Sequence, residues 1–461
     1  MLKRAIYEAL ESWKGRLHHP LVVSGLRQVG KTFIVREFAR REYAHIAYLD
    51  LRANKSVHVA FDGNFNVDEM VLSITANEPS ARFVPNETIL ILDEVQDCPN
   101  ARSSLKYWDL DGRYDVIATG SFLGVKGFRD PYPRGIPVGY EEHLEMGPLS
   151  FREFLDNADA PDEVVDHVRA AFAEKRPVLP AVHESMRSLY YQYLVVGGMP
   201  EAVNVFFGTH DLNAVREVQR RIIKSIRDDF GRYKDAHGND AVNETLKLRA
   251  EACLESLPAQ LSKEYKKFQY SLVNAKGNSP QKAEGLQYLA DTGLVLRAYN
   301  LREISKPLEG AKIANEFKVF FADTGLLVSQ LDQGTAAGVL RGDLSAYKGA
   351  IAENMVAASL VTGGFQPYYY HAPSGSPEID FVFNLDGEPT MVECKSTNNR
   401  MTSMRYVIGH PGKYGFHPAL KFADTNIGGG DGFTTYPHYA LGFLQNTVVE
   451  PSVPEVCFPK L

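Results

Sequence analysis

Hydrophobic positions in the first third of the chain follow the periods of strands and helices in turn. Residues 21–39 read LVVSGLRQVGKTFIVREFA, which is a short β-branched run, a loop bounded by glycines, and apolar positions at helical spacing. Residues 88–94 read TILILDE, an apolar run dense enough for a fully buried parallel strand. A shorter run, DVIAT, leads at residue 119 into a Gly-Ser pair. The pattern predicts an α/β domain with a parallel sheet.

The middle of the chain has mainly helical patterning. Residues 156–233 read as helices and connectors, and three further helical stretches follow at 244–258, 261–273 and 281–293. The strand-like LVLRAYNL comes next. Three helices followed by a β-hairpin predict a winged helix-turn-helix.

The last quarter of the chain returns to a mixed pattern. A helix-like segment, GAIAENMVAASLV, begins at residue 349, and two strand-like segments follow, EIDFVF at 378–383 and MVECKS at 391–396. Beyond these, a glycine-rich turn leads into one more strand or helix. The order predicts a second α/β unit.

Composition limits the class of protein. At 461 residues the chain is long enough for three or four domains. Hydrophobic residues make up 44% and charged residues 23%, as in ordinary globular proteins, and no apolar run approaches the roughly 20 residues that span a bilayer. We therefore expect a cytoplasmic protein with no membrane contact. The four cysteines form no CxxC pair, and the net charge of -7 argues against a generally basic, nucleic-acid-coating protein.

The glycine-bounded loop matches the pattern G-x-x-x-x-G-K-[ST], which closes backbone N–H groups around phosphate oxygens at a helix N-terminus. In this pattern Lys31 meets the β and γ phosphates and Thr32 offers its hydroxyl to Mg²⁺. The alternative is a glycine turn with an incidental Lys-Thr pair. The residues expected to contact ATP or another nucleoside triphosphate are Gly25, Leu26, Arg27, Gln28, Val29, Gly30, Lys31, Thr32 and Phe33.

Two adjacent carboxylates end the second apolar run. Asp93 is expected to hold Mg²⁺, and Glu94 to activate the attacking water as general base, which indicates hydrolysis as well as binding. The third run would place Thr119 and Ser121 at the same edge of the sheet, where either could sense the γ-phosphate. A strand ending in Thr-Gly-Ser is equally an ordinary turn.

The segments GLRQVGKT, LILDEVQ, VIATGS and LEMGPLSFREFL together resemble the ATPase module of AAA-plus ATP-binding proteins from bacteria and archaea. VVGGMPEAV at 195–203 and FKVFFADTGLL at 317–327 are similar to later signatures of the same proteins, whose C-terminal half is catalogued as a domain of unknown function. The resemblance implies a helical lid over the nucleotide and, since relatives often form rings, a homo-oligomer. Arg134 and Arg129 are candidates for an arginine finger, although a solvated loop arginine is at least as good an interpretation.

The C-terminal strands bring two carboxylates and a lysine together. Glu393 and Lys395 lie two residues apart and so project from one face of a strand. With Asp380 on the preceding strand and Glu353 on the helix, the spacing resembles the PD-(D/E)xK nuclease core. The resemblance implies Mg²⁺, or Mn²⁺, held by the three acids, with Lys395 positioning or activating water. The alternatives are a nuclease-like fold that only binds, or strand ends with solvated charges.

Ten lysines and arginines face six acids between residues 261 and 320, so this part of an acidic protein is locally basic. DNA is therefore the expected partner, with RNA not excluded, although winged helices also serve as protein-contact modules. The predicted domains are an AAA-plus core (1–155), a helical lid or connector (156–240), a winged-helix-like domain (241–335) and a PD-(D/E)xK-like domain (340–461).

The leading hypothesis is an ATP-hydrolysing protein that acts on nucleic acid and cuts it with a Mg²⁺-dependent C-terminal domain. The first alternative is a nucleotide-dependent switch whose C-terminal domain binds DNA or protein without cutting. The second is a protein-interaction scaffold that uses ATP to set its oligomeric state.

Overall fold

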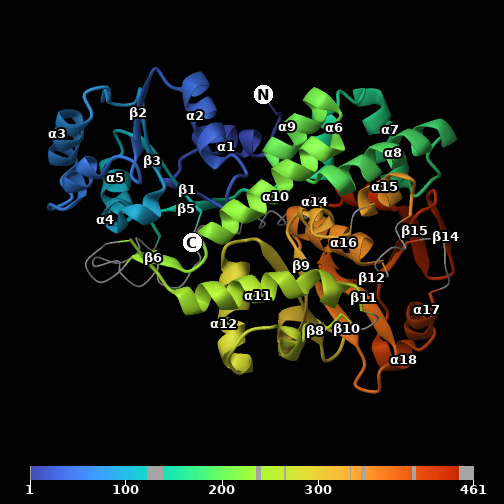
Figure 1. Ribbon diagram of the computed structural model, residues 1–461. Coiled ribbons are helices and arrows are strands. Elements are labelled where there is room, and N and C mark those ends of the chain that lie inside the picture. Colours follow the sequence, from blue (N-terminus) through green and yellow to red (C-terminus); the bar gives the residue numbers. More distant parts are fainter. Residues whose placement is uncertain are drawn as a thin grey trace, which may run out of the picture.

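The computed structural model describes residues 2–121, 139–234, 240–263, 266–332, 334–343, 349–396 and 401–445. Figure 1 shows an N-terminal sheet, a group of helices and a C-terminal sheet, with helix α10 running between the two sheets. The predicted α/β class is thus observed at both ends of the chain.

The N-terminal sheet is fully parallel, in the order β2-β3-β4-β1-β5. Its strands are β1 (Leu21–Ser24), β2 (His45–Asp50), β3 (Thr88–Asp93), β4 (Asp115–Gly120) and β5 (Glu142–Glu145). The helices around it are α1 (Ile6–Lys14), α2 (Lys31–Glu42), α3 (Val67–Asn77), α4 (Pro99–Ser103) and α5 (Leu105–Asp111), with short 3-10 turns at Lys55–Phe61 and Val95–Asp97.

Alternate side chains of the buried strands pack into two different cores, one on each face of this sheet. On β3, Ile89 and Ile91 join the core that contains α1 and α2, whereas Leu90 and Leu92 join the core that contains α3 and α5. Successive side chains of a strand point to opposite faces, so a run that is apolar throughout is buried on both. The TILILD run was predicted as such a strand, and the structure confirms it.

A group of helices connects the two sheets. It consists of α6 (Phe151–Asn157), α7 (Asp162–Glu174), α8 (Pro180–Val196), α9 (Pro200–Thr209) and α10 (Leu212–Asp228), and a small antiparallel pair, β6 (Arg232–Lys234) and β7 (Asp240–Val242), follows. Val215, Ile222 and Ile226 of α10 are buried in the same core as Val23 of β1. This core also contains Phe320 and Val356 from the C-terminal half. The three parts of the chain therefore share one core.

The C-terminal sheet has eight strands in the order β14-β15-β13-β12-β11-β10-β8-β9. They are β8 (Val295–Leu301), β9 (Lys312–Phe321), β10 (Tyr368–His371), β11 (Glu378–Leu385), β12 (Glu388–Lys395), β13 (Ala419–Ala423), β14 (Gly428–Gly430) and β15 (Phe433–Pro437). Parallel pairs join β10 to β8, β12 to β13 and β13 to β15, and the other neighbours are antiparallel.

Helices cover both faces of the C-terminal sheet. On one face, Val356 of α16 shares a core with Phe381 and Val392, and on the other Met404 of α17 shares a core with Val382. The remaining elements of this half are α11 (Glu244–Leu261), a 3-10 turn (Tyr270–Leu272), α12 (Ser279–Asp291), α13 (Leu308–Ala311), α14 (Thr324–Ser329), α15 (Thr335–Leu340), α16 (Ala350–Thr362), α17 (Thr402–Ile408), α18 (Pro411–Tyr414) and a last 3-10 turn (His438–Phe443).

The predicted winged-helix unit needs two corrections. The stretch predicted as a helix at 261–273 forms no α-helix beyond residue 261 in its described part, because Phe268 stacks on Phe317 and its N–H donates to the Phe317 carbonyl of β9 at 2.8 Å. These contacts with β9 determine the backbone conformation of this stretch, although its apolar residues are spaced as in a helix. In addition, the β8–β9 hairpin belongs to the eight-stranded sheet, since β8 pairs with β10. A boundary between 335 and 340 thus cuts through one continuous sheet.

Candidate functional site

The glycine-bounded loop lies between β1 and α2, as predicted. Gly25 and Gly30 have φ angles of 140° and 93°, in the region that favours glycine. A Cβ on Gly25 would lie 2.1 Å from the carbonyl oxygen of Met146, so only glycine fits against that strand end. Helix α2 begins at Lys31, which leaves its first backbone N–H groups directed at the loop. Such an N-terminus favours an anion.

Lys31 lies inside this loop. Its Nζ donates to the carbonyl oxygens of Gly25 and Leu26, both at 2.9 Å, and the residue is only 7% exposed. Burial lowers the pKa of Lys31 to about 8, although Glu94 and Asp93 act in the opposite direction. The ammonium group is thus held by neutral carbonyls, and an anion in the loop would stabilise its charge.

Asp93 is the centre of the polar contacts beside the loop. Its Oδ1 accepts hydrogen bonds from the Thr32 hydroxyl at 2.9 Å and from the Thr119 hydroxyl, and its Oδ2 accepts one from the Tyr48 hydroxyl at 2.7 Å. These residues come from α2, β4 and β2, and they meet because β2 and β4 flank β3 in the sheet. The hard oxygens of Thr32 and Asp93 fit Mg²⁺ bound with a nucleotide.

Glu94 follows Asp93 in a left-handed conformation, with φ of 54°. Its N–H lies 3.4 Å from the Thr119 hydroxyl, and its carboxylate accepts a hydrogen bond from Gln96. A positive φ in a residue other than glycine is uncommon and is found mainly where the surroundings impose it. The charge of Glu94 acts on Lys31 and opposes the effect of burial on its pKa.

The other predicted nucleotide residues lie around this centre with different exposure. Ser121 is 7% exposed at the end of β4, and Phe33 is 57% exposed on α2. Sequence reasoning missed Tyr48, whose hydroxyl fixes the second oxygen of Asp93. Only the strand register, which pairs Tyr48 with Ile91, brings the two side chains within reach. Arg129 and Arg134, the candidates for an arginine finger, lie outside the described residues.

Two residues of the loop contact the last turn of α10. Gln28 Nε2 donates to the Ser225 hydroxyl at 3.1 Å, and Arg27 forms an ion pair with Asp229. Asp229 is 5% exposed. Helix α10, from the segment predicted as a lid, therefore lies directly against the candidate nucleotide site.

The C-terminal acids and lysine also converge. Lys395 Nζ lies 2.5 Å from Glu393 Oε1 and 3.9 Å from Asp380 Oδ2, and the Cys394 N–H donates to Asp380 Oδ2 at 2.9 Å. Burial, with the charge of Asp380, raises the pKa of Glu393 to about 8. Although burial alone would lower the pKa of Lys395, Asp380 and Glu393 raise it. The predicted convergence of these three side chains is therefore present in the fold.

Two lysines that the sequence analysis did not assign to this cluster accompany it. Lys266 forms a buried ion pair with Glu353, the predicted helical acid, and Lys318 donates to Glu378 at 2.9 Å. Burial opposes ionisation of Glu353, but Lys266 and Lys318 lower its pKa overall. Both lysines come from the segment predicted as a winged helix, and the shared sheet places them here.

Lysines thus surround the acids that were predicted to hold a metal ion. Over the part of the chain that is described, no three or more His, Cys, Asp and Glu side chains are grouped so as to hold one. Glu353 Oε2 and Glu393 Oε2 are nevertheless buried with no hydrogen-bond partner among those residues. The metal assignment to Glu353, Asp380 and Glu393 stays a prediction.

The locally basic stretch is partly neutralised in the fold. Five of its lysines form ion pairs with acids, and Lys282 donates to two main-chain carbonyls. The paired lysines are Lys266, Lys267, Lys306, Lys312 and Lys318. Three of the partner acids, Glu353, Glu378 and Glu388, lie outside residues 261–320, so these pairs reduce the charge excess that suggested a DNA-binding surface.

No helix of the described part of the chain is long and apolar enough to cross a membrane. The three cysteines described, Cys98, Cys253 and Cys394, are buried and free.

Comparison with solved structures gives partial likenesses. The Walker-type ATPase of Pyrococcus abyssi is 15% identical with a TM-score of 0.42, over 72% of this chain and 96% of that one. The ORC2 protein of Aeropyrum pernix, in ADPNP and ADP complexes, is 13% identical with a TM-score of 0.33, over 74% of this chain and 91% of that one. No curated protein matches the chain.

Comparison with family models divides the chain into three. Residues 187–337 and 348–428 match two families described as domains of unknown function, DUF8612 and DUF4143. Residues 17–155 match the model of an AAA domain, and this match includes the loop at Lys31 and the acids at Asp93 and Glu94. Residues 17–155 are thus similar to AAA domains.

Proposed function

We propose that this protein binds and hydrolyses ATP with Mg²⁺ at the loop between β1 and α2. The observation that carries the proposal is the meeting of Lys31, Thr32, Asp93 and Glu94 at one edge of the parallel sheet, in the matched AAA domain. Ligands bind at this edge in open α/β sheets. The local N–H groups and the ammonium of Lys31 supply positive charge for phosphate oxygens.

Each residue has a distinct part in this proposal. Lys31 stabilises charge on the β and γ phosphates, while Thr32 and Asp93 hold the metal ion, which when bound polarises the phosphates. Glu94 accepts the proton of the attacking water. Thr119 fixes the orientation of Asp93 through its hydroxyl, and Ser121 lies at the same strand end.

Phosphate release from ATP tests the proposal. Purified full-length protein with Mg²⁺ is compared with Lys31→Ala, Glu94→Gln and the exposed-lysine control Lys276→Ala. We expect turnover in wild type and control, no turnover in Glu94→Gln although it still binds a fluorescent ATP analogue, and no turnover with weaker binding in Lys31→Ala. Phosphate release that is unchanged in Lys31→Ala and Glu94→Gln would exclude this site as the source of hydrolysis.

A second candidate function lies at the C-terminal cluster, as Mg²⁺- or Mn²⁺-dependent cleavage of DNA or RNA. The convergence of Asp380, Glu393 and Lys395 supports it, because carboxylate oxygens bind such metals and lysine can position water. The alternative is a domain that binds nucleic acid or protein without cutting. Neutralisation of Glu353 by Lys266 and of Glu393 by Lys395 favours this alternative.

Cleavage assays decide between these two. The full chain is incubated with single-stranded and duplex DNA and RNA, with Mg²⁺ or Mn²⁺, with and without ATP. Lys395→Ala and Lys31→Ala are tested beside Lys413→Ala, a control at an exposed lysine. Cleavage that Lys395→Ala loses and Lys413→Ala retains would support the nuclease, whereas intact substrate under every condition would leave only the binding role.

A further inference from the structure

Three sequence signatures that the nucleotide site does not use meet at one point of the fold. The Leu149 N–H donates to the Gly198 carbonyl at 2.7 Å, and the Gly198 N–H donates to Asp323 Oδ2 at 2.5 Å. Asp323 Oδ1 also accepts the Leu326 N–H at 2.8 Å and so caps α14. We call Leu149, Gly197, Gly198 and Asp323 the junction. It joins the AAA domain to both following parts of the chain.

The junction is packed so closely that no side chain fits at its glycines. A Cβ on Gly197 would lie 2.3 Å from Asp323 Oδ1, and one on Gly198 would lie 2.1 Å from the Leu149 carbonyl oxygen. A Cβ on Gly325 would lie 2.6 Å from the Gly197 nitrogen. Because close-packed elements shift together, a displacement of Leu149 should move Gly198 and Asp323 with it.

The junction is linked to the nucleotide loop by Arg4. This side chain, 6% exposed, donates to the Val29 carbonyl of the loop at 3.0 Å and to the Gly147 carbonyl at 2.8 Å. Its Nε also pairs with Glu153 at 2.9 Å. Glu153 in turn accepts the Ser150 N–H at 2.7 Å, one residue from Leu149. Arg4 thus connects the loop to the junction through charge-assisted hydrogen bonds.

Helix α10 provides a second link. Its Ser225 accepts a hydrogen bond from Gln28 of the loop. Two turns earlier, the Gln219 side chain donates to the carbonyls of Val195 and Val196 at 2.9 Å, directly before Gly197. Gln219 is 2% exposed. The Arg4 link begins at Val29 and the α10 link at Gln28, which is its neighbour in the loop. Both links lead to Gly197 and Gly198.

From the junction, hydrogen bonds continue to the helix that carries Glu353. Asn354, which is fully buried, donates to the Thr324 hydroxyl at 3.0 Å and to the Phe321 carbonyl at 3.1 Å, and its Oδ1 accepts the Phe321 N–H at 2.7 Å. Thr324 follows Asp323 in sequence. The polar contacts therefore extend from the nucleotide loop to the residue next to Glu353.

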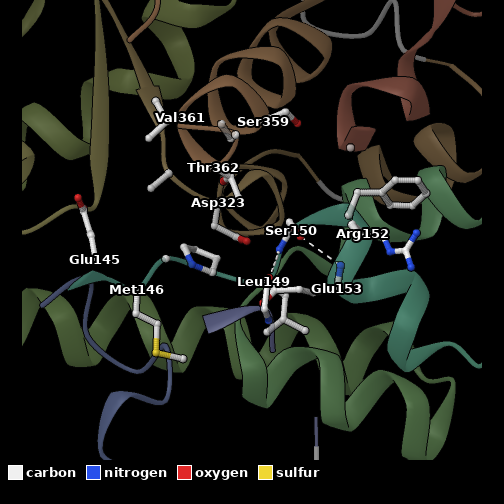
Figure 2. Close-up of a pocket in the computed structure, with 18 of the residues that line it drawn as sticks. Glu145, Met146, Leu149, Ser150, Arg152, Glu153, Asp323, Ser359, Val361 and Thr362 are labelled. Atoms are coloured by element: carbon white, nitrogen blue, oxygen red, sulfur yellow. Dashed lines mark hydrogen bonds between the residues drawn. The ribbon is translucent and has the colours of Figure 1, made fainter. Parts of the chain in front are cut away.

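A cavity of about 520 Å³ borders the junction. Its lining includes Leu149 and Asp323 together with Ser359 and Thr362 of α16, and Figure 2 shows Asp323 facing the segment from Leu149 to Glu153. The cavity gives α16 and the junction room to change their relative position.

We propose that the junction couples nucleotide binding at the loop to the position of α14 and α16, and so to the carboxylate cluster in the C-terminal sheet. The proposal rests on the nucleotide binding proposed above and concerns its regulation. When phosphate draws the loop inward, Arg4 and α10 transmit the movement to Gly197 and Gly198, and Asp323 transmits it to α14 and Asn354. Affinity for nucleotide and the conformation of the C-terminal cluster then depend on each other.

Hydrogen exchange of the full chain, with and without a non-hydrolysable ATP analogue and Mg²⁺, tests the coupling. We expect the analogue to slow exchange in peptides covering 25–33 and to change it by roughly fivefold or more in peptides covering 195–199, 323–329 and 350–362. In Arg4→Gln, at saturating analogue, the loop peptides should still respond, whereas the response of the remote peptides should be reduced to what the link through α10 transmits. Lys3→Gln, at the exposed neighbouring lysine, should behave as wild type.

Asp323→Asn provides a second variant, because it keeps the shape of the side chain but replaces one acceptor oxygen with a donor. It should lose the response at 323–329 and 350–362 and keep the loop response. Remote peptides that do not respond in wild type, or that respond equally in Arg4→Gln and Asp323→Asn, would overturn the coupling while the nucleotide site stands. A lack of protection at residues 25–33 would overturn the nucleotide site and the coupling with it.

Discussion

The two lysine–carboxylate sites of this chain use the same kinds of residue in opposite ways. Lys31 donates to main-chain carbonyls, and Asp93 accepts from the hydroxyls of Thr32, Thr119 and Tyr48. Lys395, in contrast, pairs with Glu393 inside its own cluster. Neutral partners satisfy hydrogen bonds without cancelling charge. The first site thus keeps its charges available for a ligand, and the second neutralises them internally.

The pKa shifts follow this difference. Burial lowers the pKa of Lys31 to about 8, whereas Asp380 and Glu393 raise the pKa of Lys395 against the effect of burial. An ammonium group that donates to no carboxylate gains most from an incoming phosphate. An ammonium group already paired must give up that pairing before a metal ion can use the carboxylates. The comparison predicts that Lys31 contributes mainly to nucleotide binding and Lys395 mainly to folding stability.

The largest expected effect is on folding stability at the C-terminal site. Lys395→Met leaves Glu393 and Asp380 buried without their partner, and breaking a buried pair typically costs about 3–5 kcal/mol. Urea denaturation measures the free energy of unfolding. The loss should be greater at pH 9 than at pH 6, because the carboxyls whose pKa values are raised can protonate at the lower pH.

Two further variants sharpen this test. Glu393→Gln combined with Lys395→Met should recover part of the lost stability, since one of the unpaired charges is removed. Lys413→Met, at an exposed lysine of the same half of the chain, should stay within about 0.5 kcal/mol of wild type. Equal stability of Lys395→Met and wild type would show that the pairing contributes nothing.

The next effect is on nucleotide affinity and not on stability. Lys31→Ala removes a buried ammonium that has only carbonyl partners, so the folded state loses little. Hydrogen bonds to a charged group contribute about 1.5–3 kcal/mol, so affinity for Mg²⁺–ATP should fall roughly 10- to 100-fold. Titration with a fluorescent ATP analogue gives the affinity and urea denaturation the stability. A large stability loss in Lys31→Ala would remove the contrast between the sites.

A smaller effect follows from the pKa of Lys31. Because the pKa is about 8 and bound phosphate favours the ammonium form, ATP binding should take up a proton, and affinity should decrease as the pH rises above about 8, by at most about tenfold per pH unit. Folding responds in the opposite direction: the unfolded chain binds the proton more tightly, so stability rises with pH between about 8 and the ordinary lysine pKa of 10.5.

Affinities measured from pH 7 to pH 9.5 test this linkage. Lys31→Arg is the matched variant, because its guanidinium stays protonated throughout and its affinity should not depend on pH in this range. A wild-type affinity that is constant from pH 7 to pH 9.5 would contradict a depressed pKa at Lys31.

How far the sequence predicts these sites depends on how local each contact is. The loop from Gly25 to Thr32 and the pair Glu393 and Lys395 were found because their spacing within one or two elements fixes their relation. The convergence with Asp380 followed from two adjacent strands. The predicted helix at 261–273 was wrong because contacts with β9, about 50 residues away, decide its conformation.

Other features have no local signal at all. Arg4 precedes the nucleotide loop by a helix and a strand, and Lys266 pairs with Glu353, which lies 87 residues further along the chain. The signature around Gly197 and Gly198 was visible in the sequence, but its partner Asp323 lies 125 residues away. A single sequence cannot specify such pairs, since many side chains could satisfy the same hydrogen bond.

The smallest effect concerns the one partner of Asp93 that the sequence did not reveal. Tyr48→Phe removes the hydrogen bond to Asp93 Oδ2 and leaves the ring in place, so the carboxylate loses one of the contacts that fix its orientation. A single hydrogen bond contributes about 1 kcal/mol, so ATP turnover should decrease by roughly fivefold. Tyr48 would then be a positioning residue that acts through Asp93.

Tyr43→Phe is the matched control, because the Tyr43 hydroxyl donates to Asp115 Oδ2 at 2.6 Å at the opposite end of the strands from Asp93. It removes the same kind of tyrosine–aspartate hydrogen bond and should lower stability by a similar amount without changing turnover. If both variants reduce turnover equally, the effect of Tyr48 is on the stability of the sheet. If only Tyr48→Phe reduces turnover, the neutral hydroxyls around Asp93 help to orient its carboxylate for Mg²⁺ without cancelling its charge. This retained charge distinguishes Asp93 from the lysine-paired acids of the C-terminal sheet.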